Sequence, residues 1–187
     1  MTRLNIPYGI TLNSNLIYIA DCNNDRVLAY TPGSSSGTVV AGGTGRGFTN
    51  TQLNCPGGLY FDSSTNSLII ANFFANNIVR WKLGGNNWTL LAGNINGING
   101  NTSALLDHPT SFIYDPMGNM YVADMFNHRI HMFSTEQSNG TTIAGISGVL
   151  GNSSTMLYYP VALALDNQLN LYVTDSFNQR IQKFLRY

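Results

Sequence analysis

The alternation of apolar and polar residues along the chain repeats four times at nearly constant spacing. In the clearest copy, an apolar run (Tyr121 to Ala123) is followed by a polar turn and then by a second apolar run (Ile130 to Phe133). Two short apolar runs joined by a tight polar connection predict an antiparallel pair of strands. An acidic or amide residue ends the first run in every copy. These anchor residues lie 51, 52 and 51 positions apart: Asp21, Asn72, Asp124 and Asp175.

Further elements extend each copy to four expected strands. Each copy opens with Leu-x-x-Pro, and each of the first three closes with a strand that ends in Ala-Gly. Proline cannot donate to a strand ladder, so it is placed where a strand begins. Four short antiparallel strands in a repeat of this length are typical of a propeller blade. The expected blades are residues 4–42, 53–93, 106–145 and 157–187.

We therefore expect an all-β fold, a β-propeller of four-stranded antiparallel blades that forms one domain over residues 1–187. The outer strand of the last blade is missing, and the first three residues are too short to supply it. Propellers normally close by combining terminal strands, which removes exposed edges. The pattern thus predicts an incomplete or unusually small ring, a fragment, or closure through a partner chain. Open blade edges would permit self-association.

The repeated motifs resemble the NHL-repeat β-propeller family. The resemblance rests on the Leu-x-x-Pro-x-Gly opening, the Leu-Tyr-Val-Ala-Asp type of strand and the Asn-x-Arg-Ile turn, best matched by residues 121–133 and 172–184. The second copy departs from it at Asn72, Ala75 and Asn77, and four copies also differ from the six-bladed discs usual in the family. The resemblance implies a propeller fold. It leaves function open, because the family includes protein-binding, RNA-binding and lyase members.

Charged pairs recur five residues apart around the hairpin turn. Arginine can form a fork of hydrogen bonds with a carboxylate, and this spacing lets both side chains reach the contact between blades. A catalytic residue is needed once, whereas a packing device is needed in every blade, so recurrence favours a structural role. The pairs are Asp21/Arg26, Asp124/Arg129 and Asp175/Arg180. The second blade lacks both members, and we expect its contact to be weaker.

Three histidines invite a zinc hypothesis: His108, His128 and His131. Propeller lyases that resemble this fold gather histidines from different blades around the axis, whereas all three here belong to the third blade. A zinc site needs three or four converging ligands, so we predict no metal and no cofactor. His108 and His128 are expected at the same edge of the disc.

Cysteines and glycosylation motifs bear on the compartment. Cys22 and Cys55 are expected on the same face of adjacent blades, where a disulfide is geometrically plausible, the alternative being two free thiols. Asn-x-Ser/Thr motifs fall in expected loops, at Asn87, Asn101, Asn139 and Asn152. Together with the low charge, these features favour an extracellular or secreted setting over a cytoplasmic one.

Aromatic residues occupy the turn after the anchor in three of the copies. A repeated aromatic residue on one face can be a hot spot for binding, or it can pack between neighbouring blades. Both interpretations remain open. The candidate binding residues are Phe74, Phe126, His128 and Phe177.

The amino-acid composition limits the classes of binding partner that we expect. Nine basic residues balance nine acidic ones, and only 10% of the 187 residues are charged. A neutral chain has no electrostatic footprint for nucleic acid, and no apolar run is long enough to span a membrane. We expect a non-catalytic scaffold that binds a protein, peptide or glycan through the face carrying the anchor turns. The alternatives are a metal-dependent enzyme of the amidating-lyase or lactonase type and, with less support, an RNA-binding propeller.

Overall fold

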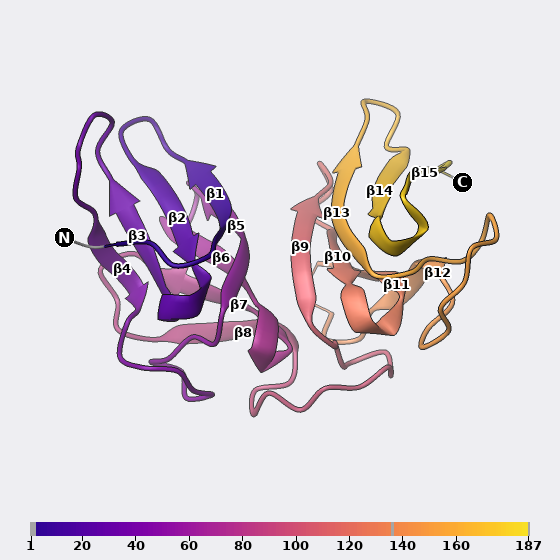
Figure 1. The fold of residues 1–187 in the computed structure, drawn as a ribbon, viewed down its shortest axis with the longest axis horizontal. Helices are drawn as coiled ribbons and strands as arrows, with labels where there is room; N and C mark the ends of the chain where they lie inside the picture. Colours follow the sequence, from indigo (N-terminus) through magenta and orange to yellow (C-terminus); the bar gives the residue numbers. More distant parts are fainter. Residues whose placement is uncertain (1–2, 136, 187) are drawn as a thin grey trace.

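A computed structural model describes residues 3–135 and 137–186, and it confirms the expected all-β propeller (Figure 1). The expected domain limits at Met1 and Tyr187 lie outside the described residues. Three sheets have four antiparallel strands and the fourth has three, each in simple sequence order. The strands are β1 (Pro7–Leu12), β2 (Ile17–Asp21), β3 (Arg26–Tyr30), β4 (Thr38–Gly42), β5 (Pro56–Asp62), β6 (Ser67–Asn72), β7 (Asn77–Lys82), β8 (Trp88–Gly93), β9 (Pro109–Tyr114), β10 (Met120–Asp124), β11 (Arg129–Phe133), β12 (Thr141–Gly145), β13 (Pro160–Leu165), β14 (Leu171–Asp175) and β15 (Arg180–Phe184).

The first strand of each blade begins at the opening proline, where the sequence pattern places a strand start. The proline lies opposite the anchor residue, as in the pair Pro7 and Asp21. The register then shifts before the regular ladder resumes at Ile10 opposite Ile19. The same irregularity recurs in the other three blades. A bulge of this kind absorbs the missing proline N–H and lets the strand start directly at the opening segment.

A short 3-10 turn joins the second and third strands of every blade. The turns are η1 (Cys22–Asn24), η2 (Phe73–Ala75), η3 (Met125–Asn127) and η4 (Ser176–Asn178). Each ends on a residue in the left-handed conformation: Asp25, Asn76, His128 and Gln179, with φ between 51° and 55°. Aspartate and asparagine tolerate this conformation best among residues with a side chain. These turns are the only helical segments in the described residues, and none of them is long enough to cross a membrane.

Neighbouring blades are joined by three apolar seams. The leucine of the Leu-x-x-Pro opening is fully buried in blades two to four, and it packs in the same cluster as an alanine of the preceding blade's fourth strand. We call these residues plug leucines: Leu53, Leu106 and Leu157. Burying a leucine side chain contributes about 1.5–3 kcal/mol, so each plug leucine is a main attachment of its blade to the one before.

The blades follow one another in an arc, with the first and fourth at its ends (Figure 1). The side chains that would meet a further blade are exposed there. On β1, Ile10 and Leu12 are 64% and 62% exposed, and Ile181 on β15 is 65% exposed. Leu4, the counterpart of the plug leucines, is only half-buried. Both end faces of the arc therefore present apolar surface.

Candidate functional site

The charged pairs tie the first, third and fourth blades each to the segment that leads into it. In the third blade, Asp124 Oδ2 accepts hydrogen bonds from Arg129 Nε at 2.7 Å and Asn127 Nδ2 at 2.8 Å, while Asp124 Oδ1 accepts the Asp107 N–H at 2.7 Å. The remaining Arg129 nitrogens donate to the carbonyl oxygens of Asn101, Thr102 and Leu105 in the connector. The pairs Asp21/Arg26 and Asp175/Arg180 repeat the Nε to carboxylate contact at 2.8 Å. Such an arrangement positions backbone, and both oxygens of the Asp124 carboxylate already have donors.

Burial sets the electrostatics of the third-blade pair. The Arg129 side chain is 2% exposed and that of Asp124 is 0% exposed. Burial raises the pKa of Asp124 to about 6, although the Arg129 guanidinium and the nearby N–H donors work in the opposite direction. A buried pair of this kind holds geometry, and losing one partner leaves an uncompensated charge.

The three departures of the second blade belong together. Asn72 keeps the Oδ1 contact with the Asn54 N–H at 2.7 Å, but an amide has no second acceptor oxygen. In the third blade, Asn127 and Arg129 donate to that second oxygen. Both donors are absent from the second blade, because Ala75 and Asn77 occupy the equivalent positions. Within the described residues, Asn72 Nδ2 and Asn77 Oδ1 have no hydrogen-bond partner. The weaker contact that we expect at this blade stays a prediction.

A second polar contact crosses each seam. The side chain of the left-handed residue accepts the N–H of the residue before the next blade's proline. Asp25 Oδ1 accepts from Cys55 at 2.9 Å, and Asn76 Oδ1 accepts from His108 at 2.9 Å. His128 Nδ1 accepts from Tyr159 at 3.4 Å. Burial lowers the pKa of His128, so that its imidazole favours the neutral form that can accept.

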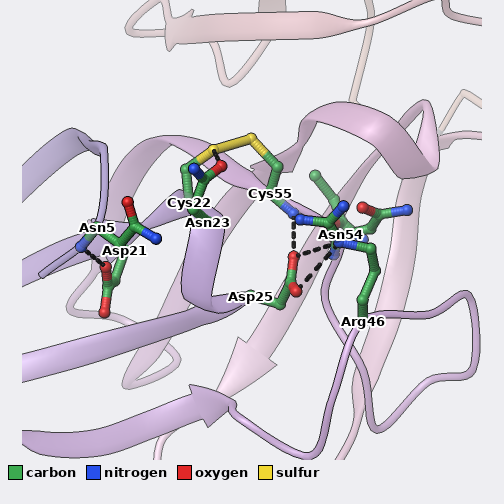
Figure 2. Close-up of a disulfide and its surroundings, with 9 residues drawn as sticks. Asn5, Asp21, Cys22, Asn23, Asp25, Arg46, Asn54 and Cys55 are labelled. Atoms are coloured by element: carbon green, nitrogen blue, oxygen red, sulfur yellow. Dashed lines mark hydrogen bonds and ion pairs between the residues drawn. A yellow bond between two sulfur atoms is a disulfide. The ribbon is translucent and has the colours of Figure 1, made fainter.

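A disulfide joins the first two blades. Cys22 follows the anchor of blade one, Cys55 precedes the proline of blade two, and their sulfur atoms are bonded (Figure 2). Beside the bridge, Asp25 accepts the Cys55 N–H and contacts Arg46 Nε at 3.2 Å (Figure 2). The first seam thus combines a covalent link with a polar contact.

Aromatic rings continue the line of the disulfide along the same edge of the arc. We call this row the aromatic strip: Phe73, Phe74, His108, Phe126, Tyr159 and Phe177. Successive ring centroids are 4.8 Å (Phe73 to His108), 4.2 Å (His108 to Phe126), 5.1 Å (Phe126 to Tyr159) and 4.8 Å (Tyr159 to Phe177) apart. The three outermost phenylalanines are 42%, 41% and 58% exposed: Phe74, Phe126 and Phe177. The strip crosses three blades and one of its sides faces solvent.

The structure brings three of the four candidate binding residues into this one strip. Phe74, Phe126 and Phe177 are half-exposed, whereas His128 is buried beneath Tyr159 with its ring centroid 4.9 Å away. Sequence reasoning missed Tyr158 and Tyr159, which occupy the variable positions of Leu-x-x-Pro. The signal was present, because His108 occupies the same position as Tyr159 one repeat earlier.

The three histidines lie in three different environments. His108 lies in the strip with Nδ1 2.5 Å from Asp107 Oδ1, and His128 lies in the third seam. His131 is buried on β11, where Nε2 meets the Ser103 carbonyl oxygen at 3.0 Å and burial lowers its pKa to about 4. Among the described residues, no three His, Cys, Asp or Glu side chains gather closely enough to hold a metal.

A large cavity lies away from the strip. It measures about 820 Å³ and opens at the rim between the third and fourth blades, against β12, β14 and β15. The three-stranded fourth blade leaves this rim uncovered. Its lining includes Ala144, Leu171 and Phe184 of the third apolar seam, so it is the uncovered end of that seam.

The four glycosylation motifs are all accessible. Asn87, Asn101, Asn139 and Asn152 are exposed and lie outside the strands. Their accessibility is what a glycan acceptor requires. Glycosylation of these residues stays a prediction.

Comparison with protein families and curated proteins returns one family by name. A model described as "NHL repeat" matches residues 157–184. A curated relative, "NHL repeat-containing protein 2" from Bos taurus, is 35% identical over 97 residues, which is 48% of this chain and 13% of that protein.

Solved structures share the fold at low identity. An auxiliary nutrient binding protein from Bacteroides ovatus superposes with a TM-score of 0.71 at 16% identity, over 97% of this chain and 48% of that one. A gluconolactonase from Xanthomonas campestris superposes with a TM-score of 0.67 at 17% identity, over 92% of this chain and 55% of that one. The chain spans about half the length of these propellers and a small part of the curated relative.

Proposed function

We propose that this chain, a β-propeller whose residues 157–184 match the NHL repeat, is a non-catalytic scaffold that binds a protein, peptide or glycan through the aromatic strip. One observation carries the proposal: rings from three successive blades form an unbroken, half-exposed row. Aromatic side chains provide large contact area at low entropic cost, and they are enriched among binding hot spots. With no net charge, affinity would come from these rings and from nearby backbone groups.

The polar features of the same face support a binding role over a catalytic one. The anchor carboxylates accept backbone and arginine donors and are fully buried, so a substrate on this face would not reach them. The three histidines have different hydrogen-bond partners and lie in three separate environments. A lactonase-type or lyase-type reaction would need ligands converging from several blades, and the described residues supply no such group.

The test is a parallel selection on a random-peptide display library and a glycan array. The immobilised proteins are the natural chain, a Phe126→Ala/Phe177→Ala variant and a Phe48→Ala control. Phe48 is a matched ring that is 49% exposed in a connector outside the strip. Hot-spot truncation costs about 2 kcal/mol or more, so binders should lose at least tenfold in affinity for the double variant only. Binders that tolerate the double variant as well as the control would refute the proposal.

The exposed motifs and the disulfide support an extracellular site of action. The observation is the pairing of four accessible Asn-x-Ser/Thr motifs with an interblade disulfide. Expression through a eukaryotic secretory pathway should yield secreted protein whose mass falls on enzymatic deglycosylation. Retention in the cell, or a mass equal to that of the bare chain, would oppose this assignment.

The two apolar end faces support self-association as an additional partner mode. They are the two halves of a seam: Leu4 and Ile10 on one side, Ile181 on the other. Light scattering over a range of concentrations should show dimers that an Ile10→Asp/Ile181→Asp variant loses. A concentration-independent monomer would refute it.

A further inference from the structure

The position before the opening proline has a constant role in blades three and four. There it carries a ring that lies between two phenylalanines of the aromatic strip. His108 has its ring centroid 5.4 Å from Phe74 and 4.2 Å from Phe126, and Tyr159 lies 5.1 Å from Phe126 and 4.8 Å from Phe177. The strip is therefore built from rings that the turns and the opening segments contribute alternately.

The second blade lacks its ring at this position. Cys55 stands there and is bonded to Cys22, so its side chain extends back into the seam. The residue after the proline is also small: Gly57 replaces the Thr110 and Val161 of the later blades. A Cβ on Gly57 would lie only 2.9 Å from the Thr110 carbonyl oxygen, so glycine is required by the close approach of the next blade.

A cavity occupies the place of the missing ring. It measures about 210 Å³, and its lining includes the Cys22–Cys55 disulfide, Ile6, Tyr8, Phe73 and Phe74. The lining surface is almost wholly apolar, and Asn23 and Tyr8 are the lining residues that carry a polar side-chain group. Ile6 and Tyr8 are 57% and 51% exposed, which makes them walls of an open site.

We propose that this cavity receives one aromatic side chain from a protein or peptide partner, which restores the missing ring of the aromatic strip at blade two. The proposal rests on the proposed binding function and names the chemistry that the partner must bring. An apolar cavity of about 150 Å³ binds benzene, so about 210 Å³ accommodates a substituted ring.

The lining favours a ring over other occupants. Sulfur makes favourable contacts with aromatic edges, and Phe73 and Phe74 offer ring faces and edges. A sugar or a charged group would lose hydrogen bonds to water and regain few from this lining. The disulfide also fixes the floor between two blades, so little ordering of the protein opposes binding.

The experiment titrates N-acetyl-phenylalaninamide into the intact chain and follows backbone amide shifts by NMR. The matched probe is N-acetyl-cyclohexylalaninamide, which has similar size and no π-system. We expect saturable shifts at Asn23, Cys55 and Gly57, with tighter binding of the aromatic probe. Phe74→Ala and Tyr8→Ala, two separate wall variants, should each weaken that binding by about fivefold.

Ile10→Ala is the control, because it removes an exposed apolar side chain from the same strand as Tyr8 but outside the cavity. Equal or tighter binding of the cyclohexyl probe, or equal losses in Ile10→Ala and Tyr8→Ala, would overturn the proposal. Selected peptides that need Phe126 yet carry no aromatic residue would overturn it too, while leaving the scaffold function standing. Probe binding without any selected partner would uphold the ring site and refute the scaffold.

Discussion

Removing the Arg129 side chain tests whether the buried charged pairs hold the structure. In Arg129→Ala, Asp124 keeps its N–H donors from Asp107 and Asn127 but loses its only cation, in a site with 0% side-chain exposure. Breaking a buried pair by removing one partner costs about 3–5 kcal/mol, because a charge is left uncompensated. For a chain of this length, that loss lowers the melting temperature by about 6–20 °C.

The best control is a double variant in which Asp124, the partner of Arg129, is replaced as well. Asp124→Asn/Arg129→Ala removes the stranded charge yet keeps an Oδ1 acceptor for Asp107, as Asn72 does for Asn54 in the second blade. We expect the double variant to be more stable than Arg129→Ala alone. Arg180→Ala should cost less than Arg129→Ala, because the Arg180 side chain is 31% exposed and water can replace it.

The assay is urea unfolding followed by circular dichroism and tryptophan fluorescence, whose transitions must coincide for a free energy to be defined. In Arg129→Ala the folded pKa of Asp124 rises further above its unfolded value, so stability is lost as pH rises through it. The penalty should therefore be larger at about pH 8 than at about pH 5. A loss below about 1 kcal/mol, or a double variant no better than the single one, would refute the reasoning.

Three further outcomes follow from the disulfide and from two buried histidines. Reduction should raise the intact mass by about 2 Da, and Cys22→Ser/Cys55→Ser should lose about 3–4 kcal/mol in urea unfolding for a bridge spanning 33 residues; unchanged values would mean no bridge. The pKa of His131 falls from about 6.5 unfolded to about 4 folded, so stability is lost as pH falls through this window, by about 2 kcal/mol between pH 7 and 5. His131→Gln should flatten that dependence, and an unaltered pH profile would contradict the assignment. His128→Asn should also reduce acid sensitivity, since asparagine accepts the Tyr159 N–H without titrating; the prediction fails if the variant is as acid-labile as the natural chain.

The fold follows from the sequence because every level of the repeat points to the same answer. Apolar alternation, proline at the strand start and the polar hairpin turn recur in phase, so the four blades are visible without any tertiary information. The bulge in the first strand of each blade was the part that the pattern did not show. The proline pairs with the anchor across a bulge, and a bulge leaves no mark in a two-residue alternation.

The site was only half visible for a similar reason. Phe74, Phe126 and Phe177 recur at one position of the turn and could be found by aligning the copies. The rings between them, His108 and Tyr159, sit in a different part of the repeat and meet the phenylalanines only when two blades pack together. The carbonyl partners of Arg129 were likewise invisible, because the connector's path is set by long-range packing.

Because of the plug leucines, the repeating unit of the sequence and the repeating unit of the packing begin at different residues. By sequence, Leu106 opens the third unit; by packing, it completes the second, in one cluster with Ala92. A fragment cut at the sequence boundary would therefore have an exposed plug leucine at one end and an unoccupied leucine-binding site at the other. The stability of such an array depends on the number of interfaces between neighbouring repeats. Each added repeat contributes one complete interface, and an isolated repeat contributes none.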